Sequence, residues 1–436
     1  MSGIRDTIRT RCPRLTKAVK WCKRRKNELS ALPRHLKRRR LQRKRQRQAP
    51  GKIKVAFICQ YIPAWSKNQR LYEALRGDER FEALLICVPN RVFANQLRDP
   101  EDLSNDTYDY FVSHGYPEAV NALVGKDEWY DLRAAGVDYV IYNRYDRPMP
   151  IPYTSARISA HAKVCLIEYG TSLLRMVDMM FDYPFLANTY CFFAENDAKR
   201  GEFLRWNLAL SRLGLSQAVC CGIPAVENAY MAQDAPAPAW SFSQNAFRAI
   251  YAPRWTTDPV WGGSTFLRYR EFFLKLADER PELDFLVRPH PLMFQHFIDT
   301  GLMTAEEAAA FEAACGARPN IRLDQEKEYL ATFWKSSVLI CDFSSMIIEY
   351  FITGKPIIYL TYDENIAYTD QMDAMLSGCY LVNDEDALRR TIEMLSAGED
   401  PLAPVRDEVC KTQLLQGANL KASENMKQVL LDSYRK

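Results

Sequence analysis

Apolar runs alternate with amphipathic stretches along most of this chain, and this alternation predicts its elements. Residues 52–59 (KIKVAFIC) form a continuous apolar run, a helical stretch follows near 68–76, and a second apolar run occupies 82–88. Strands that are apolar on both faces are typical of parallel sheets, because helices cover both sides of such a sheet. The sequence therefore predicts a β–α–β start. Further strands are expected at 139–142, 164–167, 190–194 and 217–221.

A second α/β unit follows the first. Its expected strands are 249–252, 284–287, 338–341 and 357–360, and its expected helices are 266–276 and 385–395. The segment that begins at Asp234 (DAPAPA) has the composition of a linker. We therefore predict an α/β fold of two Rossmann-like domains, residues 51–235 and 246–405, with a cleft between them. Residues 1–50 are expected to form a basic helical arm and residues 406–436 a helical tail.

The stretch 338–360 carries the most specific chemistry. A buried strand leads to Asp342, the chain continues Phe343-Ser344-Ser345, and an amphipathic helix follows as far as Gly354. Backbone N–H groups and two hydroxyls then gather at a helix N-terminus on the carboxyl edge of a parallel sheet, where α/β folds bind phosphate. Glu349 lies one turn after Ser345, where its carboxylate could accept hydrogen bonds from ribose hydroxyls. The stretch predicts a protein that uses a nucleoside diphosphate.

These residues also have structural interpretations. Ser344 and Ser345 could cap the helix, which is compatible with phosphate binding. Glu349 could be a surface residue in an i,i+4 pair, although it lies too far along the helix for a capping box. Asp342 could close the strand by accepting bonds from backbone N–H groups.

Charge is divided unevenly between the start of the chain and the rest. Residues 1–54 contain 21 Lys and Arg against Asp6 and Glu28, so this part carries about +19 and the remainder about −15. Apolar residues recur every three or four positions in this arm, with a dense basic cluster at 37–45 and a possible break at Pro13. The pattern suits an interfacial helix and a polybasic patch, residues 1–48, on an anionic membrane surface. A solvated, disordered tail is the plain alternative, and a nucleic-acid partner is not expected because few aromatic residues are interleaved.

The cysteines and the hydropathy indicate a compartment. The twelve cysteines form no CxxC pair, and no apolar run approaches about 18 residues. Together with the lack of a signal peptide, this predicts reduced thiols in a cytoplasmic protein, peripheral on the inner face of the membrane. No His/Cys group has the spacing of zinc ligands, and no cofactor is expected, although a diphosphate could carry Mg²⁺.

Five motifs in register resemble the CDP-glycerol glycerophosphotransferase family, the teichoic acid polymerases and primases. Residues 251–255 (YAPRW) look like its YAPTWR segment, and residues 288–291 (RPHP) look like its R-x-H-P turn. Residues 342–345 with Glu349 and Lys355-Pro356 look like its TDYSS…D/E…KP block, and Tyr362-Asp363 with Tyr368 echoes its YD…Y. The turn Tyr169-Gly170-Thr171 matches the N-terminal half more loosely. The resemblance implies a two-domain glycosyltransferase-B (GT-B) arrangement, with the acceptor bound by the N-terminal domain and the nucleotide by the C-terminal one.

The chain departs from the family at one position. The family has a histidine before the Gly-Thr, proposed to be the catalytic base, and Tyr169 stands there in this chain. A phenol with a pKa of about 10 is a poor base at neutral pH. Three interpretations stay open: Tyr169 positions the acceptor, another group takes the proton, or this branch uses a different acceptor.

The resemblance implies a phosphoryl transfer and assigns roles. A hydroxyl of a lipid-linked polymer attacks the β-phosphorus of a CDP-alditol, and CMP leaves, as in teichoic acid or capsule biosynthesis. His290 would donate to a phosphate oxygen or to CMP, and Arg288 would pair with the diphosphate, although His290 could merely cap a turn and Arg288 could point away. Arg254 would contact phosphate or base. Gly170 and Thr171 would form a turn on the acceptor side.

Other functions are kept open. The first alternative is a GT-B glycosyltransferase that builds capsule or O-antigen from a nucleotide sugar. A non-catalytic scaffold would also explain Tyr169, and a nucleic-acid binder is more distant. His114, His161 and His296 have no supporting context and are expected to be structural.

Overall fold

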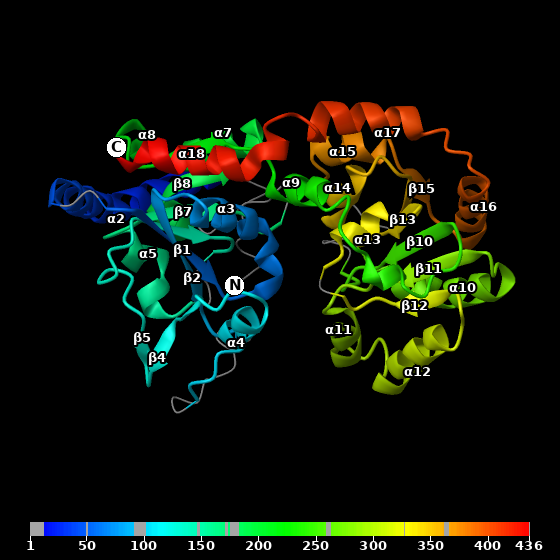
Figure 1. The fold of residues 1–436 in the computed structure, drawn as a ribbon. Coiled ribbons are helices and arrows are strands. Elements are labelled where there is room, and N and C mark those ends of the chain that lie inside the picture. The colour runs from blue at the N-terminus through cyan, green and yellow to red at the C-terminus, as the bar shows by residue number, and fades with distance from the viewer. Residues whose placement is uncertain are drawn as a thin grey trace. The chain divides into compact units, whose positions relative to one another are not determined.

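The computed structural model describes most of the chain, and this part folds into two compact units (Figure 1). The described residues are 13–48, 51–90, 102–145, 149–170, 173–174, 183–258, 263–326, 328–361 and 366–435. Unit one comprises the described residues up to 169, those from 183 to 224 and those from 421 onward. Unit two comprises Gly170, residues 173–174 and the described residues from 225 to 420.

Unit one is built on a parallel sheet of seven strands in the order β3-β2-β1-β6-β7-β8-β9. Its strands are β1 (Ile53–Cys59), β2 (Phe81–Cys87), β3 (Val120–Asn121), β6 (Tyr139–Tyr142), β7 (Lys163–Ile167), β8 (Thr189–Ala194) and β9 (Gln217–Cys220). Two further strands, β4 (Leu123–Gly125) and β5 (Glu128–Trp129), form a separate antiparallel pair. Every residue of β6, β7 and β8 is buried, because helices and loops cover both faces of the sheet.

The helices of unit one pack apolar side chains against this sheet. They are α2 (Pro13–Gln48), α3 (Ser66–Arg76), α4 (Asp106–Ser113), α5 (Ser155–Ile158), α6 (Tyr183–Asn188), α7 (Asp197–Trp206), α8 (Leu208–Arg212) and α18 (Ala422–Tyr434). One core contains Phe57, Trp65 and Tyr72, and a second, with β-strand residues of the opposite parity, contains Phe192 and Trp206. Two cores around one sheet are what strands of alternating side-chain direction produce.

Unit two repeats the parallel architecture with six strands in the order β12-β11-β10-β13-β14-β15. These are β10 (Phe247–Ala252), β11 (Leu283–Val287), β12 (Ile321–Leu323), β13 (Val338–Cys341), β14 (Ile357–Leu360) and β15 (Tyr380–Val382). The helices are α9 (Pro224–Met231), α10 (Phe266–Glu279), α11 (Met293–Asp299), α12 (Ala305–Gly316), α13 (Leu330–Trp334), α14 (Met346–Phe351), α15 (Asp370–Leu376), α16 (Glu385–Ser396) and α17 (Ala403–Val409). The apolar runs therefore predicted the α/β class and its long strands correctly, and the additional strands β3, β4, β5, β12 and β15 are all three residues or shorter.

The helix α2 is part of the body of unit one. Its inward face, Glu28, Ala31, His35, Arg38 and Gln42, is buried at a spacing of three or four residues. Gln42 donates to the carbonyl of Asp138, the residue before β6, and His35 contacts the carbonyl of Ala187, shortly before β8. α2 thus runs across the amino ends of the parallel strands.

The expectation of a separate arm differs from this arrangement, and the expected break at Pro13 falls where the described residues begin. The described part of the arm is one helix that begins at Pro13 and continues through Pro33, and residues 1–12 lie outside the described residues. The basic cluster at 37–45 is also divided, because Arg38 is fully buried whereas Lys37 and Arg40 are exposed. A helix turns every third or fourth side chain inward, so composition alone could not show which cations pack against the sheet.

The C-terminal segment is likewise divided between the units. α17 belongs to unit two, where the fully buried Arg406 donates to the carbonyl of Gly354. α18 belongs to unit one, where the Tyr139 hydroxyl donates to the carbonyl of Leu430 at 2.8 Å (Figure 1). The expected tail at 406–436 is therefore two elements held by different cores.

A cationic and aromatic layer fills the space beneath α2. The Arg38 guanidinium lies 4.8 Å from the centre of the Tyr190 ring, and the Lys163 ammonium lies 4.5 Å from the same ring. Lys163 also donates to the carbonyl of Ser433 in α18. Burial, reinforced by the charge of Arg38, lowers the pKa of Lys163 to about 7. Cation–π contacts of this kind compensate part of the cost of burying positive charge.

His35 is the neutral member of this layer. Its Nε2 donates to the Ala187 carbonyl at 2.8 Å, and its Nδ1 accepts from Arg38 Nη1 at 2.8 Å. Burial, together with the charge of Arg38, lowers the pKa of His35 to about 3. The folded chain therefore keeps this ring neutral where the unfolded chain protonates it.

We expect His35 to make unit one sensitive to acid. Because the native pKa is lowered, stability is lost as the pH falls from about 6.5, and this residue costs roughly 3 kcal/mol at pH 4.5 relative to pH 7. A His35→Gln variant should be less stable than wild type at pH 7 but should lose less stability on acidification. Urea unfolding of both proteins at pH 7 and pH 4.5 measures the difference, and equal losses in the two would contradict the assignment.

Candidate active site

Three loops meet at the carboxyl edge of the sheet in unit two. They follow β10, β11 and β13, which are neighbours in the sheet. The backbone N–H of His290 donates to the Pro253 carbonyl at 3.1 Å, and the backbone N–H of Arg254 donates to Asp342 Oδ1 at 2.9 Å. The structure therefore brings His290, Arg254 and the 342–345 loop to one edge, as the sequence predicted.

Asp342 holds this edge together. Besides Arg254, its carboxylate accepts hydrogen bonds from the backbone N–H and the hydroxyl of Thr265, just before α10. The side chain is 1% exposed, and burial raises its pKa to about 7 against the opposing effect of these bonds. The carboxylate closes the strand as one of the two interpretations expected, and its oxygens are directed at the protein backbone.

The Arg254 side chain contacts the loop that carries Ser344 and Ser345. Its Nη1 donates to the Phe343 carbonyl at 2.9 Å, and its guanidinium lies 4.8 Å from the centre of the Phe343 ring. A cavity of about 480 Å³ adjoins it, lined also by Trp255, residues 256–258 and His296. The Trp255 and His296 rings meet edge to face at 4.9 Å, so His296 packs beside the site.

His290 is set up as a hydrogen-bond donor. Its Nδ1 accepts from the backbone N–H of Leu292 at 3.2 Å, which leaves the proton of the neutral ring on Nε2. Burial, together with the charge of Arg254, lowers the pKa of His290 to about 4. A neutral imidazole with its proton on Nε2 can donate a hydrogen bond to an oxyanion.

The two serines differ in their surroundings. Ser344 Oγ is half-buried and accepts from the backbone N–H of Met346 at 3.2 Å. Ser345 is exposed, and its side chain makes no capping hydrogen bond to α14. α14 is six residues long, so the hydroxyls and loop N–H groups matter more here than a helix dipole.

Arg288 and Glu349 belong to a second cluster joined by Tyr329. The Tyr329 hydroxyl donates to Glu349 Oε2 at 2.6 Å, and the Arg288 guanidinium lies 4.5 Å from the Tyr329 ring. Arg288 also pairs with Asp324 at 2.6 Å and donates to the Glu326 carbonyl at 2.8 Å. Glu349 is 4% exposed. Both side chains thus have protein partners of their own, and the long-range residues Asp324 and Tyr329 had no signal in the sequence.

Lys355 and Tyr368 from the family-like block have structural partners. Lys355 donates to the carbonyl of Ser336 at 2.6 Å, and burial lowers its pKa to about 8. The hydroxyls of Tyr368 and Tyr359 are hydrogen-bonded at 2.9 Å. Tyr362, Asp363 and Thr171 lie outside the described residues.

Tyr169 lies at the carboxyl edge of the sheet in unit one, directly after β7 and Glu168. Its backbone N–H donates to the Asn143 carbonyl at 2.9 Å, and its ring meets that of Tyr61 edge to face at 5.6 Å. The ring is 37% exposed, and Gly170 follows it in the turn. The phenol is thus presented at an edge that other polar groups share.

A buried charge cluster beside Tyr169 was missed from the sequence. Lys199 in α7 pairs with Glu168 at 2.5 Å and with Glu195 at 3.0 Å. Burial raises the pKa of Glu168, while the charge of Lys199 opposes the rise. Glu168 and Glu195 follow the neighbouring strands β7 and β8, and that position was the available signal. The cluster combines one ammonium with two carboxylates, so a proton acceptor is present next to Tyr169.

Comparison with solved structures defines the class of fold. The wall teichoic acid polymerase TagF, in a crystal soaked with CDPG, aligns with a TM-score of 0.54 at 14% identity, covering 97% of this chain and 98% of that one. UDP-GlcNAc 2-epimerase from Neisseria meningitidis, bound to UDP-GlcNAc, aligns with a TM-score of 0.54 at 13% identity, covering 88% and 100%. The fold is therefore GT-B-like, with two parallel α/β sheets, as predicted.

A match to a known protein family lies within the C-terminal unit. Residues 248–397 match the model of the family described as CDP-Glycerol:Poly(glycerophosphate) glycerophosphotransferase, and the match includes residues of every strand of that sheet. Over that region the chain is similar to this family of transferases, in agreement with the resemblance seen in the sequence motifs. A search of curated proteins finds no match to the chain.

Two negative findings concern the described residues alone. Within those ranges, no three His, Cys, Asp or Glu side chains are arranged to hold a metal ion. None of the helices built from them combines the length and apolar character needed to span a bilayer.

Proposed function

We propose that this protein transfers glycerol phosphate, or a related polyol phosphate, from a CDP-alditol to a lipid-linked polymer acceptor and releases CMP. The observation that carries the proposal is the family match over 248–397 together with the donor groups gathered at the carboxyl edge of that same sheet. The structural likeness to TagF, at 14% identity, supports the fold, and the experiment below tests the donor and the acceptor.

In the proposed reaction, the acceptor oxygen attacks the β-phosphorus of the donor. A P–O bond to the acceptor forms, the bond from the β-phosphorus to the bridging oxygen breaks, and CMP leaves with that oxygen. Charge grows on the leaving phosphate, where a preorganised donor stabilises it. Nε2–H of His290 and the hydroxyl of Ser345 are the groups we assign to this task, with Ser344 and Arg254 shaping the loop. Arg288 and Glu349 are assigned to the donor site through Tyr329.

The proton of the acceptor hydroxyl needs a base, and we assign it to Glu168. A carboxylate whose pKa is raised by burial is a better base than an ordinary one, and it lies next to Tyr169. Tyr169 would then orient the acceptor together with the Gly170 turn.

Turnover of CDP-alditols tests the proposal. The purified chain should release CMP from CDP-glycerol or CDP-ribitol in the presence of membranes, and His290→Ala should lower kcat by about 100-fold because one donor to the leaving group is lost. An NMR or chromatographic assay of CMP measures both. If UDP-sugars are consumed and no CDP-alditol is, the alternative of a GT-B glycosyltransferase for capsule or O-antigen replaces the proposal.

A pH profile tests the base. In wild type, kcat should fall as the pH drops through the raised pKa of Glu168, because the carboxylate must be ionised. Glu168→Gln should lose at least about 100-fold in kcat and lose this acid limb, whereas Tyr169→Phe should keep the limb. A limb that persists in Glu168→Gln and vanishes in Tyr169→Phe would reverse the two roles.

We further propose that the outward face of α2 rests on an anionic membrane surface. Exposed Lys26, Lys37, Arg40, Lys44 and Arg47 recur on one side of the helix, and the exposed Leu29 and Leu36 lie at the edge of this side. The only acidic residue of α2, Glu28, is buried on the other side. Such a face suits a peripheral protein on the inner leaflet, where anionic lipids attract basic helices.

Charge reversal is the appropriate test, because deleting residues 1–48 would uncover the core at Tyr190 and Lys163. The triple variant Lys26→Glu, Arg40→Glu, Lys44→Glu should bind anionic vesicles at least about 100-fold more weakly, at roughly 1 kcal/mol per charge. A control with Arg212, Lys411 and Lys421 changed to Glu has the same net charge and should bind nearly as wild type. Equal losses in both triples, measured by vesicle sedimentation at two salt concentrations, would show a general charge effect.

A further inference from the structure

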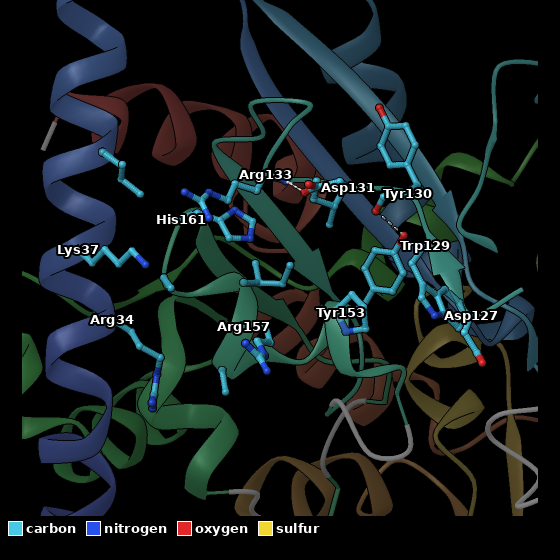
Figure 2. Close-up of a pocket in the computed structure, with 16 residues that line it drawn as sticks. Arg34, Lys37, Asp127, Trp129, Tyr130, Asp131, Arg133, Tyr153, Arg157 and His161 are labelled. Atoms are coloured by element: carbon cyan, nitrogen blue, oxygen red, sulfur yellow. Dashed lines mark hydrogen bonds between the residues drawn. The ribbon is translucent and has the colours of Figure 1, made fainter. Parts of the chain in front are cut away.

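Unit one contains a cavity of about 720 Å³ that the transfer reaction does not use (Figure 2). One wall is α2, which contributes Arg34, Lys37 and Leu41. The others are the segment 127–133 and the segment 152–161. The cavity is large enough for a ligand of several polar groups and is comparable with known small-molecule sites.

The basic end of this cavity lies at the amino edge of the sheet. Arg133 precedes β6 by six residues, and His161 precedes β7 by two. Glu168 and Tyr169, in contrast, follow β7 at its carboxyl end. Because β6 and β7 are parallel, the basic end and the proposed base are on opposite edges of one sheet.

Positive groups outnumber carboxylates around the cavity. Arg34, Lys37, Arg133 and Arg157 line it against Asp127 and Asp131. Asp131 already accepts from the backbone N–H groups of Arg133 and Ala134, at 2.8 and 3.1 Å. Within the described residues, Lys37, Arg133 and Arg157 have no carboxylate partner. The excess of positive charge favours an anionic ligand.

His161 provides an independent sign of a missing partner. The side chain is 9% exposed and lines the cavity between Arg133 and α2 (Figure 2). Its Nδ1 is buried and has no hydrogen-bond partner among the described residues. Burial, with the charge of Arg45 added, lowers the pKa of His161 to about 4, so the ring is a neutral donor and acceptor. A buried polar atom is costly unless a ligand or water satisfies it.

The opposite end of the cavity is aromatic. Trp129 and Tyr153 meet edge to face with ring centres 5.8 Å apart. The Tyr153 hydroxyl donates to the Tyr130 carbonyl at 2.9 Å, so the ring is fixed in place (Figure 2). Fixed aromatic faces suit the C–H groups of a polyol or sugar, while the basic end suits a phosphate.

We propose that this cavity binds a phosphodiester of a polyol. The phosphate would lie between Arg133, Arg157 and Lys37, a hydroxyl would bond to His161, and the carbon chain would pack on Trp129. Two sources share this chemistry: the headgroup of phosphatidylglycerol and a soluble chain of polyol phosphates. The inference does not depend on the proposed transfer reaction, because it concerns the other edge of the sheet.

Binding of defined probes tests it with the full chain. The soluble probe is glycerophosphoglycerol, measured by calorimetry, and the membrane probe is a phosphatidylcholine vesicle that contains either phosphatidylglycerol or phosphatidylserine at equal charge. Arg133→Gln with Arg157→Gln should bind about tenfold more weakly, since two charge-assisted donors are lost. The matched control is Arg205→Gln with Arg212→Gln, two exposed arginines of the same unit. His161→Phe keeps a ring and removes both nitrogens, and it should also weaken binding.

Each outcome either supports or overturns the proposed binding of a polyol phosphodiester. Binding of the soluble probe that falls in the cavity variants and not in the control supports the proposal with a free phosphodiester as ligand. A preference for phosphatidylglycerol over phosphatidylserine vesicles that the cavity variants lose supports it with a lipid headgroup as ligand. No binding of either probe, or binding that falls equally in variants and control, overturns it. CMP release should be unchanged in the cavity variants, so failure here is distinguishable from failure of the transferase proposal.

Discussion

The carboxyl edge of the sheet in unit two depends on one buried carboxylate. Asp342 follows the end of β13 and accepts hydrogen bonds from the loop after β10 and from the residue before α10, which lie 88 and 77 residues earlier in the chain. Taking a carboxylate out of water is costly, and the three donors offset that cost only when all the loops are in place. The positions of these loops therefore depend on one another, and the loops in turn fix the positions of His290, Arg254 and the two serines.

In unit one, the two ends of the parallel strands carry different kinds of residues. At the carboxyl ends, Glu168, Tyr169 and Glu195 are polar and grouped, as parallel sheets favour for ligand sites. At the amino ends, α2 and α18 close the sheet with Arg38, Lys163 and the Tyr139 hydroxyl. The cations of α2 therefore serve two purposes, since those directed inward pack on rings and those directed outward remain in solvent.

The sequence was sufficient to predict those features that depend on a local pattern of residues. Apolar runs located the long strands, and the order of polar residues after them placed His290, Arg254 and Ser345 at one edge. It was insufficient to predict contacts between side chains that are far apart in the sequence. Nothing near Arg288 shows that Asp324 and Tyr329 will occupy it, and nothing near Glu349 shows that a tyrosine hydroxyl will meet it. The burial of Arg38 needed the ring of Tyr190, 152 residues further along the chain. Local spacing predicts a face, and only the packed fold shows what that face contacts.

The proposal that Glu168 is the base also accounts for Tyr169 at the position where the resemblance led us to expect a histidine. A phenol at the end of β7 can be held by Tyr61 and presented to an acceptor, but it keeps its proton at neutral pH. Burial raises the pKa of the carboxylate one residue earlier, Glu168, while the charge of Lys199 opposes the rise, and we propose that this carboxylate takes the proton of the acceptor. In the proposed reaction, two side chains at this strand end would share the functions expected of that histidine, with Tyr169 orienting the acceptor and Glu168 taking the proton. Because Lys199 also pairs with Glu195, the cluster remains net negative, and this favours proton uptake by one of its two carboxylates.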